Sequence, residues 1–194
     1  MDVSDITVVI PHINTPLRNV LLKHTLASIK EQTYAPYDVI VEEDTTHAGA
    51  AVTRNRGLER VVTSLVAFVD DDDYFYPRHL EMCRNALLEH DADIVYPWFD
   101  VIEGTDPLGM FGKPFDPEHL KVSNYIPITV VAKTESLRAV GGFTPHPDAA
   151  GHPNEDWGCW LAVYNAGGKF VHVAERLWAW RHNSQNTSGR GDRW

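Results

Sequence analysis

Four consecutive aspartates, Asp70 to Asp73, follow directly on an apolar run at residues 65–69. The run is rich in β-branched and aromatic side chains, which is typical of a buried strand. Two unit charges about 4 Å apart repel by roughly 4 kcal/mol at an effective dielectric of about 20, so water, arginine, a proton or a cation must offset them. In an extended chain Asp70 and Asp72 share one side, which suits Mg²⁺ or Mn²⁺ with a phosphate as co-ligand. The alternative is a solvated acidic turn.

The residues after the acidic run predict that it lies between a strand and a helix. Pro77 suits the first turn of a helix, and Leu80, Cys83 and Leu87 continue at helical spacing. The acids therefore stand where a strand leaves the core. In open α/β sheets, ligands bind at the carboxyl ends of the strands.

The composition is that of one globular domain. The chain has 194 residues, enough for a substantial core, and carries 27 Asp and Glu against 17 Lys and Arg, a net charge of −10. This balance argues against a surface for nucleic-acid backbone or anionic membrane. Cys83 and Cys159 fall in helical apolar patterns, which predicts free buried thiols. Neither a signal peptide nor a transmembrane segment is visible in the sequence, so we expect a cytoplasmic protein.

Strand-like and helix-like patterns alternate along the first half of the chain. We expect strands at residues 6–10, 39–41, 65–69 and 93–96. We expect helices at residues 16–32, 50–62 and 77–90, the first of them capped by Thr15. This alternation predicts an α/β fold with a mostly parallel central sheet flanked by helices.

The second half has a less regular pattern. Residues 104–124 carry Gly, Pro and charge without periodicity, and we expect a long surface excursion there. A polar loop at residues 145–154 follows later, and Asn154 can cap the helix after it. The other elements expected are a strand at 128–132, a short helix at 134–140 and a last strand at 170–173.

Several short segments, in order along the chain, resemble the motifs of one family. They are residues 8–11, 25–44, 53–57, 68–73, 140–143, 155–161 and 181–182. Their order resembles that of the nucleotide-sugar-dependent glycosyltransferases of the GT-A fold, closest to the inverting enzymes of family 2. The acidic run resembles that family's DxD motif, and Thr53-Arg54-Asn55-Arg56-Gly57 resembles its "aRN.G" helix. The ordered set is far more specific than DxD alone.

The resemblance implies a single GT-A (Rossmann-like) domain over residues 1–182. Its nucleotide-sugar half would cover about 1–100 and its acceptor and catalytic half about 101–182, with a polar tail at 183–194. It also implies an enzyme that uses Mn²⁺ or Mg²⁺ to move a sugar from a nucleoside diphosphate sugar to an acceptor hydroxyl with inversion. UDP is the favoured nucleotide, and the sugar, the acceptor and the oligomeric state stay open.

The resemblance also assigns roles to individual residues. Asp156 is expected to be the catalytic base, with Glu155 as the alternative. Metal contacts are expected from Asp70, Asp72 and His182. Nucleotide-sugar contacts are expected from Pro11, Glu43, Arg54, Asp70 and Asp71. Asp71 can instead orient its neighbours.

Each assignment has an ordinary structural alternative. Glu43 stands where relatives have aspartate and can be a surface acid, Arg54 can be solvated, and His182 can be a structural residue beside its aromatic neighbours. Trp98 and Phe99 follow a predicted strand and could stack on an acceptor sugar. At the level of the whole chain, one rival function is a non-catalytic nucleotide-sugar or metal-binding module. The other is a sugar-1-phosphate nucleotidyltransferase, which needs a Gly-rich basic loop that residues 11–14 do not provide.

Overall fold

The first half of the chain alternates strands and helices, as the apolar pattern predicts. The structure, a computed structural model, describes residues 4–103, 106–144, 146–147 and 154–182. The elements of the first half are β1 (Ile6–His12), α1 (Pro16–Lys30), β2 (Asp38–Glu43), α2 (Ala50–Arg60), β3 (Leu65–Phe68), β4 (Tyr74–Phe75) and α3 (His79–His90). β4 was not expected, because two residues show no periodicity. α3 begins at His79, two residues after the expected Pro77.

Two long parallel strands, β5 (Ile94–Glu103) and β8 (Phe170–Arg181), dominate the second half. Both continue well past the residues predicted as strand, because each provides the other with backbone partners. β6 (Asp106–Phe111) pairs with β5, so the prediction of a surface excursion is wrong for these residues. The remaining elements are α4 (Pro117–Leu120), β7 (Val131–Lys133), α5 (Thr134–Ala139) and α6 (Glu155–Asn165).

The strands form one eight-stranded sheet in the order β2-β1-β3-β7-β5-β8-β4, with β6 beside β5. β1 pairs parallel with β2 and β3, and β5 pairs parallel with β8. β7 runs antiparallel to both of its neighbours, β3 and β5. The predicted α/β fold with a mostly parallel sheet is therefore confirmed.

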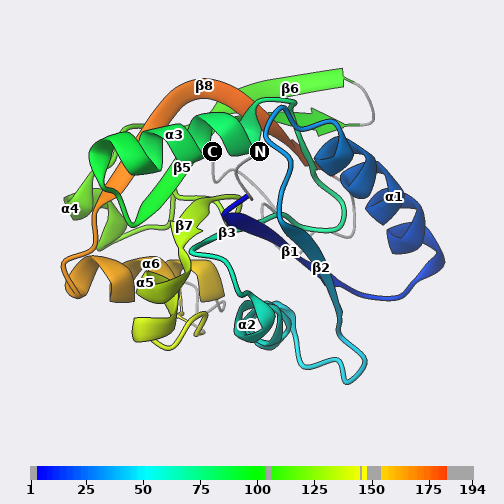
Figure 1. Cartoon of the computed structure of the whole chain (residues 1–194), viewed down its shortest axis with the longest axis horizontal. Helices are drawn as coiled ribbons and strands as arrows, with labels where there is room; N and C mark the ends of the chain where they lie inside the picture. Colours follow the sequence, from blue (N-terminus) through cyan, green and yellow to red (C-terminus); the bar gives the residue numbers. More distant parts are fainter. Residues whose placement is uncertain (1–3, 104–105, 145, 148–153, 183–194) are drawn as a thin grey trace.

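Helices cover both faces of the sheet (Figure 1). α1 and α3 lie on one side, where Ile29, Leu80 and Leu87 join the apolar core. α2, α5 and α6 lie on the other side, where Leu58 and Trp160 are buried in the second apolar core. Burial of apolar surface on both faces explains why the central strands are continuous apolar runs.

The carboxyl ends of β1, β2 and β3 meet at one edge of the sheet. His12, the last residue of β1, lies opposite Glu43, the last residue of β2. Thr15 then caps α1 as predicted, and its Oγ1 accepts a hydrogen bond from the Arg18 backbone N–H at 3.2 Å. The sequence therefore brings Arg18, in the first turn of α1, to the edge at which ligands bind in such folds.

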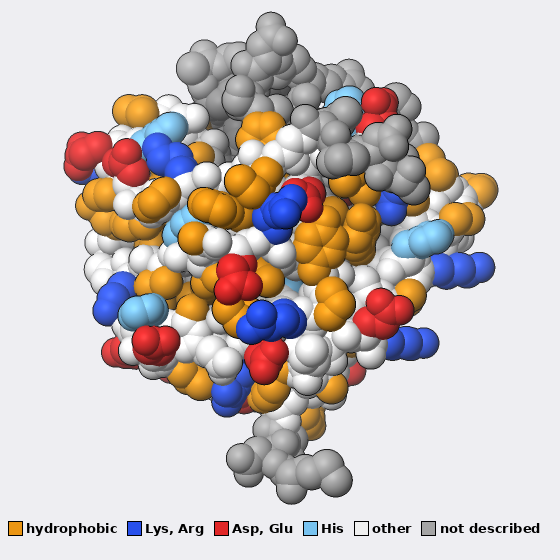
Figure 2. Space-filling view, turned by 90° about the horizontal axis from the view of Figure 1, so that it is seen from above, with side chains coloured by type: hydrophobic (Ala, Val, Ile, Leu, Met, Phe, Trp, Pro, Cys, Tyr) orange, Lys and Arg blue, Asp and Glu red, His pale blue; other side chains and the backbone are white. Residues whose placement is uncertain are grey.

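The predicted states of the cysteines are confirmed. Cys83 and Cys159 are free and buried, and burial raises the pKa of both thiols, so neither is set up to react. Within the described ranges, no helix combines the length and the apolar character needed to cross a bilayer. The face seen from above in Figure 2 intersperses Lys and Arg with Asp and Glu and shows no broad basic patch.

Gly57 lies where α2 packs closest against β1. A Cβ atom at this position would come to 2.4 Å from Cγ1 of Val9, which is fully buried. We expect Gly57→Ala to lower the free energy of unfolding by about 1–3 kcal/mol, the usual cost of overpacking a core. Denaturant unfolding measures this, with Glu59→Ala at an exposed position of the same helix as control. A Gly57→Ala variant as stable as the wild type would contradict this packing.

Candidate active site

The acidic run leaves β3 as a turn rather than as an extended strand. β3 ends at Phe68, and the backbone N–H of Asp73 donates to the Asp70 carbonyl at 3.1 Å. The strand-like alternation expected for these acids is therefore wrong at Asp73. The turn brings one carboxylate oxygen from each of Asp70, Asp72 and Asp73 within 4.8 Å of one another. Asp71 takes part in a separate set of contacts.

This group of three carboxylates fits a hard divalent cation. Asp72 and Asp73 are buried, and in the part of the chain that the structure describes, Oδ2 of Asp73 has no hydrogen-bond partner. Burial and the charges of Asp72 and Asp70 raise the pKa of Asp73. A buried carboxylate oxygen without a partner is costly, and a cation would remove the cost. Oxygen donors of this kind are those that Mg²⁺ and Mn²⁺ prefer.

The β1–α1 segment supplies counter-charges to the acidic run. Nδ1 of His12 lies 2.7 Å from Oδ2 of Asp71, and Nη1 of Arg18 lies 2.6 Å from Oδ1 of the same carboxylate. The same Arg18 nitrogen lies 2.8 Å from Oδ2 of Asp72. Thr25 adds a hydrogen bond from its hydroxyl to the Asp73 carbonyl at 2.6 Å. Asp71 is thus enclosed by protein partners, which favours the orienting role over direct contact with a ligand.

The end of β8 approaches the same turn from the other side. The backbone N–H of Arg181 donates to Oδ1 of Asp73 at 2.8 Å, and its Nε donates to the Asp72 carbonyl at 3.1 Å. His182, the next residue, does not belong to the group of side chains that lie close enough together to share a cation, which is Asp70, Asp72 and Asp73. Its ring packs edge-on against Trp180, with centroids 5.6 Å apart, and its buried Nδ1 has no hydrogen-bond partner among the described residues.

Arg54 connects the acidic turn to the start of α6. The residue is 4% exposed, its Nη2 lies 2.6 Å from Oδ1 of Asp70, and its Nη1 lies 2.5 Å from Oε1 of Glu155. The two carboxylates raise the pKa of this guanidinium, so it remains charged despite burial. Arg54 is therefore not the solvated helical arginine of the alternative interpretation. It connects Asp70 in the predicted nucleotide-sugar half of the chain with Glu155 in the predicted catalytic half.

Asp156 follows Glu155 in the first turn of α6 and is half-buried. Its Oδ1 accepts a hydrogen bond from the Trp157 backbone N–H at 2.8 Å. Burial and the neighbouring charge of Glu155 raise the pKa of Asp156 to about 6. Asn154 occupies the N-cap position as predicted, although its side chain does not make the capping hydrogen bond. Trp157 is buried in the core, and its indole N–H donates to the Leu120 carbonyl at 2.7 Å.

Asn55 links two of the sequence motifs. Its side chain accepts from the Phe143 N–H at 2.8 Å and donates to the Phe143 carbonyl at 2.9 Å. A Cβ atom on Gly142 would come to 2.3 Å from Oδ1 of Asn55, so a side chain at that position would break this link. The Phe143 ring in turn lies 6.0 Å from the Arg54 guanidinium. Asn55 thus positions Phe143, the ring that lies beside the Arg54 guanidinium.

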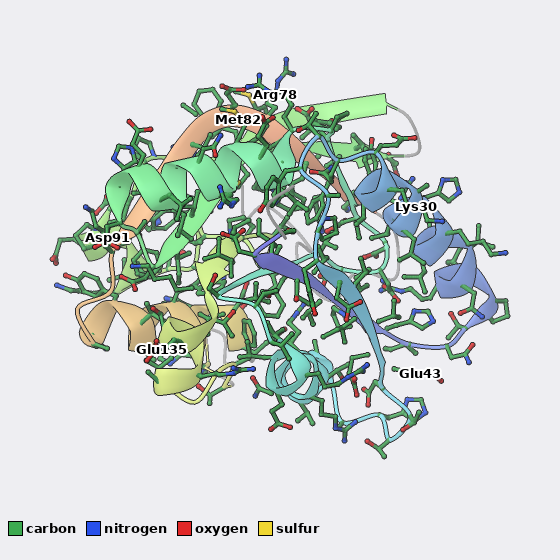
Figure 3. The ribbon with its side chains drawn as sticks, in the orientation of Figure 1. Lys30, Glu43, Arg78, Met82, Asp91 and Glu135 are labelled. Atoms are coloured by element: carbon green, nitrogen blue, oxygen red, sulfur yellow. The ribbon has the colours of Figure 1, made fainter. Side chains whose placement is uncertain are left out.

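The end of β2 presents two acids in different states. Glu43 is exposed, and Figure 3 shows it at the end of β2, near the edge of the molecule. Asp44 is buried and accepts hydrogen bonds from the N–H groups of Ala48 at 2.8 Å and Gly49 at 2.9 Å. Although burial opposes it, these bonds lower the pKa of Asp44. Pro11 lies in β1 opposite Glu42, beside this strand end.

The two aromatic residues considered for acceptor stacking differ in accessibility. Trp98 lines an open hollow of about 640 Å³ together with Met110, Ala174, Glu175 and Arg176. Phe99 is 3% exposed and stacks on Trp178 with ring centroids 4.5 Å apart. Stacking of a sugar on Phe99 is therefore excluded by its packing, while Trp98 stays a candidate.

Several residues of the site were not assigned by the sequence analysis: His12, Arg18, Asp73 and Arg181. Asp73 stands in the acidic run and Arg181 in the last of the family motifs, but neither signal assigns the residue a role. For Arg18, Thr15 and Pro16 define a helix start and place it in the first turn, after a strand that ends at the ligand edge. His12 and Arg181 meet the acidic turn only through the tertiary fold. The polar loop containing His146 and His152 lies largely outside the described residues.

The fold matches that of a solved structure, TarS of Staphylococcus aureus. The structure superposes on Staphylococcus aureus TarS (residues 1–349, in complex with UDP-GlcNAc) with a TM-score of 0.72 over 96% of this chain and 62% of that chain, at 17% identity. The UDP complex of the same protein gives a TM-score of 0.68 over 92% of this chain at 17% identity. At this identity the likeness defines the fold, which is the GT-A fold expected from the sequence.

The family follows from the sequence comparison. The family model described as "Glycosyl transferase family 2" matches residues 43–143, which is more than half of the chain. The chain therefore belongs to glycosyl transferase family 2, and the predicted resemblance is confirmed.

Named relatives are similar over different parts of the chain. "Uncharacterized glycosyltransferase YwdF" of Bacillus subtilis is 26% identical over 84% of this chain and 70% of its own length. "Uncharacterized glycosyltransferase YibD" of Escherichia coli is 48% identical over 25% of this chain. "UDP-Glc:alpha-D-GlcNAc-diphosphoundecaprenol beta-1,3-glucosyltransferase WfgD" of Escherichia coli is 24% identical over 46% of this chain. The match spans 14% of YibD and 45% of WfgD, and 60% of the solved TarS fragment.

Proposed function

We propose that this chain transfers a sugar from a nucleoside diphosphate sugar to an acceptor hydroxyl, with a divalent cation and with inversion at the anomeric carbon. One observation carries the proposal. Arg54 holds Asp70, at the acidic turn, on one side and Glu155, next to Asp156, on the other. A group of carboxylates that fits a cation thus lies close to a carboxylate suited to act as a base.

Asp156 is the base in this proposal. Inversion requires one carboxylate to accept the proton of the acceptor hydroxyl while the hydroxyl oxygen attacks the anomeric carbon. A pKa of about 6 leaves Asp156 largely ionised at neutral pH yet more basic than an ordinary aspartate. Its place in the first turn of α6 adds the favourable field of the helix dipole to the ionised form.

The carboxylates of the acidic turn hold the cation in this proposal. Asp70, Asp72 and Asp73 are the residues that would bind Mn²⁺ or Mg²⁺. When bound, such a cation stabilises a diphosphate that leaves with two negative charges. Arg54 keeps Asp70 in place and keeps Glu155 away from the role of a free base, because its guanidinium occupies both carboxylates.

The names and titles of two relatives contain UDP or a UDP-sugar. Two of the TarS structures contain UDP-GlcNAc or UDP, and the name of WfgD specifies a UDP-sugar. These likenesses support a UDP-sugar donor for this chain. A nucleotidyltransferase is less well supported, because β1 ends at His12, whose ring is fixed to Asp71 and Asn19 rather than followed by a Gly-rich loop.

A thermal-unfolding panel tests the donor assignment. The panel compares nucleoside diphosphates and their sugars, each with Mn²⁺ and with EDTA. A ligand present at about 100 times its dissociation constant adds about 2.7 kcal/mol to the free energy of unfolding, which raises the melting temperature measurably. We expect UDP or a UDP-sugar to raise it only with Mn²⁺. A panel in which no nucleotide stabilises the protein would overturn the proposal.

Glu43 is proposed to contact the nucleobase. Its position at the end of β2, opposite His12, places it on the edge that carries the acidic turn. We expect Glu43→Ala to weaken UDP binding by roughly 1 kcal/mol, the net value of one hydrogen bond, without changing the melting temperature. Calorimetric titration with UDP measures this, with the exposed Asp38→Ala at the opposite end of β2 as control. Unchanged UDP affinity would return Glu43 to the role of a surface acid.

His182 is proposed to contact the cation or the diphosphate. Its neighbour Arg181 binds the acidic turn, and its own Nδ1 lacks a partner among the described residues. We expect His182→Ala to weaken Mn²⁺-dependent UDP binding about tenfold or more, because loss of a metal ligand, or of a residue that orients one, has an effect of this size. Calorimetric titration with UDP in Mn²⁺ and in EDTA separates the loss of cation-dependent binding from the loss of direct contacts to the nucleotide. Normal affinity in Mn²⁺ would identify His182 as a structural residue that packs on Trp180.

A further inference from the structure

Arg18 forms ion pairs with two carboxylates of the acidic turn, and the proposed reaction gives these pairs no role. Its Nη1 lies 2.6 Å from Oδ1 of Asp71 and 2.8 Å from Oδ2 of Asp72. Its side chain is 18% exposed, so the pair with Asp72 is only weakly screened by water. Asp72 is also one of the three carboxylates that could share a cation. A guanidinium and a divalent cation therefore have a common ligand.

The contacts around Arg18 fix it in this position. Oδ2 of Asp71 is bound by His12, and Oδ1 of Asp71 anchors the guanidinium. The backbone N–H of Arg18 is bonded to the capping hydroxyl of Thr15, which fixes the first turn of α1. The contact with Asp71 would therefore hold Arg18 in the site if its contact with Asp72 were lost.

We infer that Arg18 is a resident counter-ion of the cation site, which lowers the affinity of the site for a divalent cation until a nucleoside diphosphate is present. Like charges that share a carboxylate repel, so a cation must displace the guanidinium from Asp72 or bind beside it. A diphosphate brings negative charge that compensates both positive groups. Arg18 thereby couples cation binding to donor binding. This inference rests on the proposed function, because it assumes that the acidic turn binds a cation.

Mn²⁺ titration in the absence of nucleotide tests the inference, with the signal of free Mn²⁺ in electron paramagnetic resonance as the readout. We expect Arg18→Gln to bind Mn²⁺ at least about ten times more tightly than the wild type, a difference of about 1.4 kcal/mol. Addition of UDP should reduce the difference between the two proteins. The control is Arg84→Gln, which removes the same charge from an ion pair with Asp5 at the opposite end of β1 and should bind Mn²⁺ as the wild type does.

The outcomes separate the inference from the function on which it rests. Equal or weaker Mn²⁺ binding by Arg18→Gln, with clear binding by the wild type, overturns the role of Arg18 alone. UDP binding without Mn²⁺ binding in both proteins overturns the cation requirement and the inference together.

A second measurement uses the unaltered chain, in case Arg18→Gln does not fold. The side-chain resonance of Arg18 in nuclear magnetic resonance should shift when Mg²⁺ and UDP are added, because the contact with Asp72 changes. That of Arg84 should not shift. An Arg18 resonance that does not respond overturns the inference.

Discussion

Replacement of Asp156 by asparagine is expected to lower the rate of sugar transfer by about 10²–10⁴-fold, the usual contribution of a general base. Asparagine keeps the shape of the side chain and can still accept from the Trp157 N–H through its carbonyl oxygen. Donor binding and its dependence on Mn²⁺ should therefore persist. Rate measurements at saturating donor, together with calorimetric UDP affinity, separate loss of the base from loss of the pocket.

Glu155→Gln provides the matched control for this prediction. Glu155 is bound to Arg54, so its replacement should disturb positioning and lower the rate less than Asp156→Asn does. If Asp156→Asn turned over at nearly the wild-type rate while Glu155→Gln did not, the role of base would pass to Glu155. If neither variant lost activity, the inverting mechanism itself would be wrong.

The raised pKa of Asp156 also predicts how rate and stability depend on pH. The base acts when ionised, so kcat/KM should fall as the pH drops through about 6. Stability has the opposite sign. A carboxyl whose pKa is higher in the folded state than in the unfolded state stabilises the fold at pH values below its unfolded-state pKa. This contribution is lost as the pH rises through the folded-state pKa of about 6. Asp156→Asn should therefore be at least as stable as the wild type at pH 8.

Replacement of Asp72 by alanine is expected to weaken UDP binding in Mn²⁺ by on the order of 10²-fold. The reason is that a bound cation contributes several kcal/mol to the stabilisation of a diphosphate. Affinity in EDTA should change little, so that the variant loses its dependence on Mn²⁺. Calorimetric titration with UDP in both conditions measures this.

Asp38→Ala is the control for the removal of one acid from the chain. Asp38 is exposed and stands at the start of β2, at the opposite edge of the sheet from the carboxyl ends that carry the acidic turn. Equally tight UDP binding by the wild type in Mn²⁺ and in EDTA would rule out a role for the cation. In that case the arginines that contact the acidic turn, Arg18, Arg54 and Arg181, would have to offset its charge without a cation.

Much of the fold could be predicted from local pattern. The apolar runs of β1, β2 and β3 and the helical spacing of α1 and α3 are contiguous in sequence, and each pattern is complete within its own segment. The extent of β5, β8 and β6 could not be predicted in this way. Pro97 interrupts the pattern of β5, and β8 shifts register against it nearby, so only pairing between distant segments defines these strands.

The candidate site shows the same division. The acidic turn is visible because its four carboxylates are adjacent, and Asp156 because it stands at a helix start within a family motif. The partners that set their charge come from elsewhere. Arg54 and Glu155 are separated by 101 positions, and Arg181 and Asp73 by 108. An isolated arginine gives no sign of its partner, so these contacts require the three-dimensional structure.

Turnover of a UDP-sugar, followed by proton nuclear magnetic resonance in the presence of Mn²⁺, tests the central claim most directly. Water can replace the unknown acceptor, and the coupling constant of the first anomeric proton to appear reports its configuration. The proposed function predicts release of UDP with a sugar of inverted configuration, in a reaction that EDTA abolishes and that Asp156→Asn slows by about 10²–10⁴-fold. Release of a sugar with retained configuration, or no turnover of any UDP-sugar by a chain that binds UDP and Mn²⁺, would contradict it.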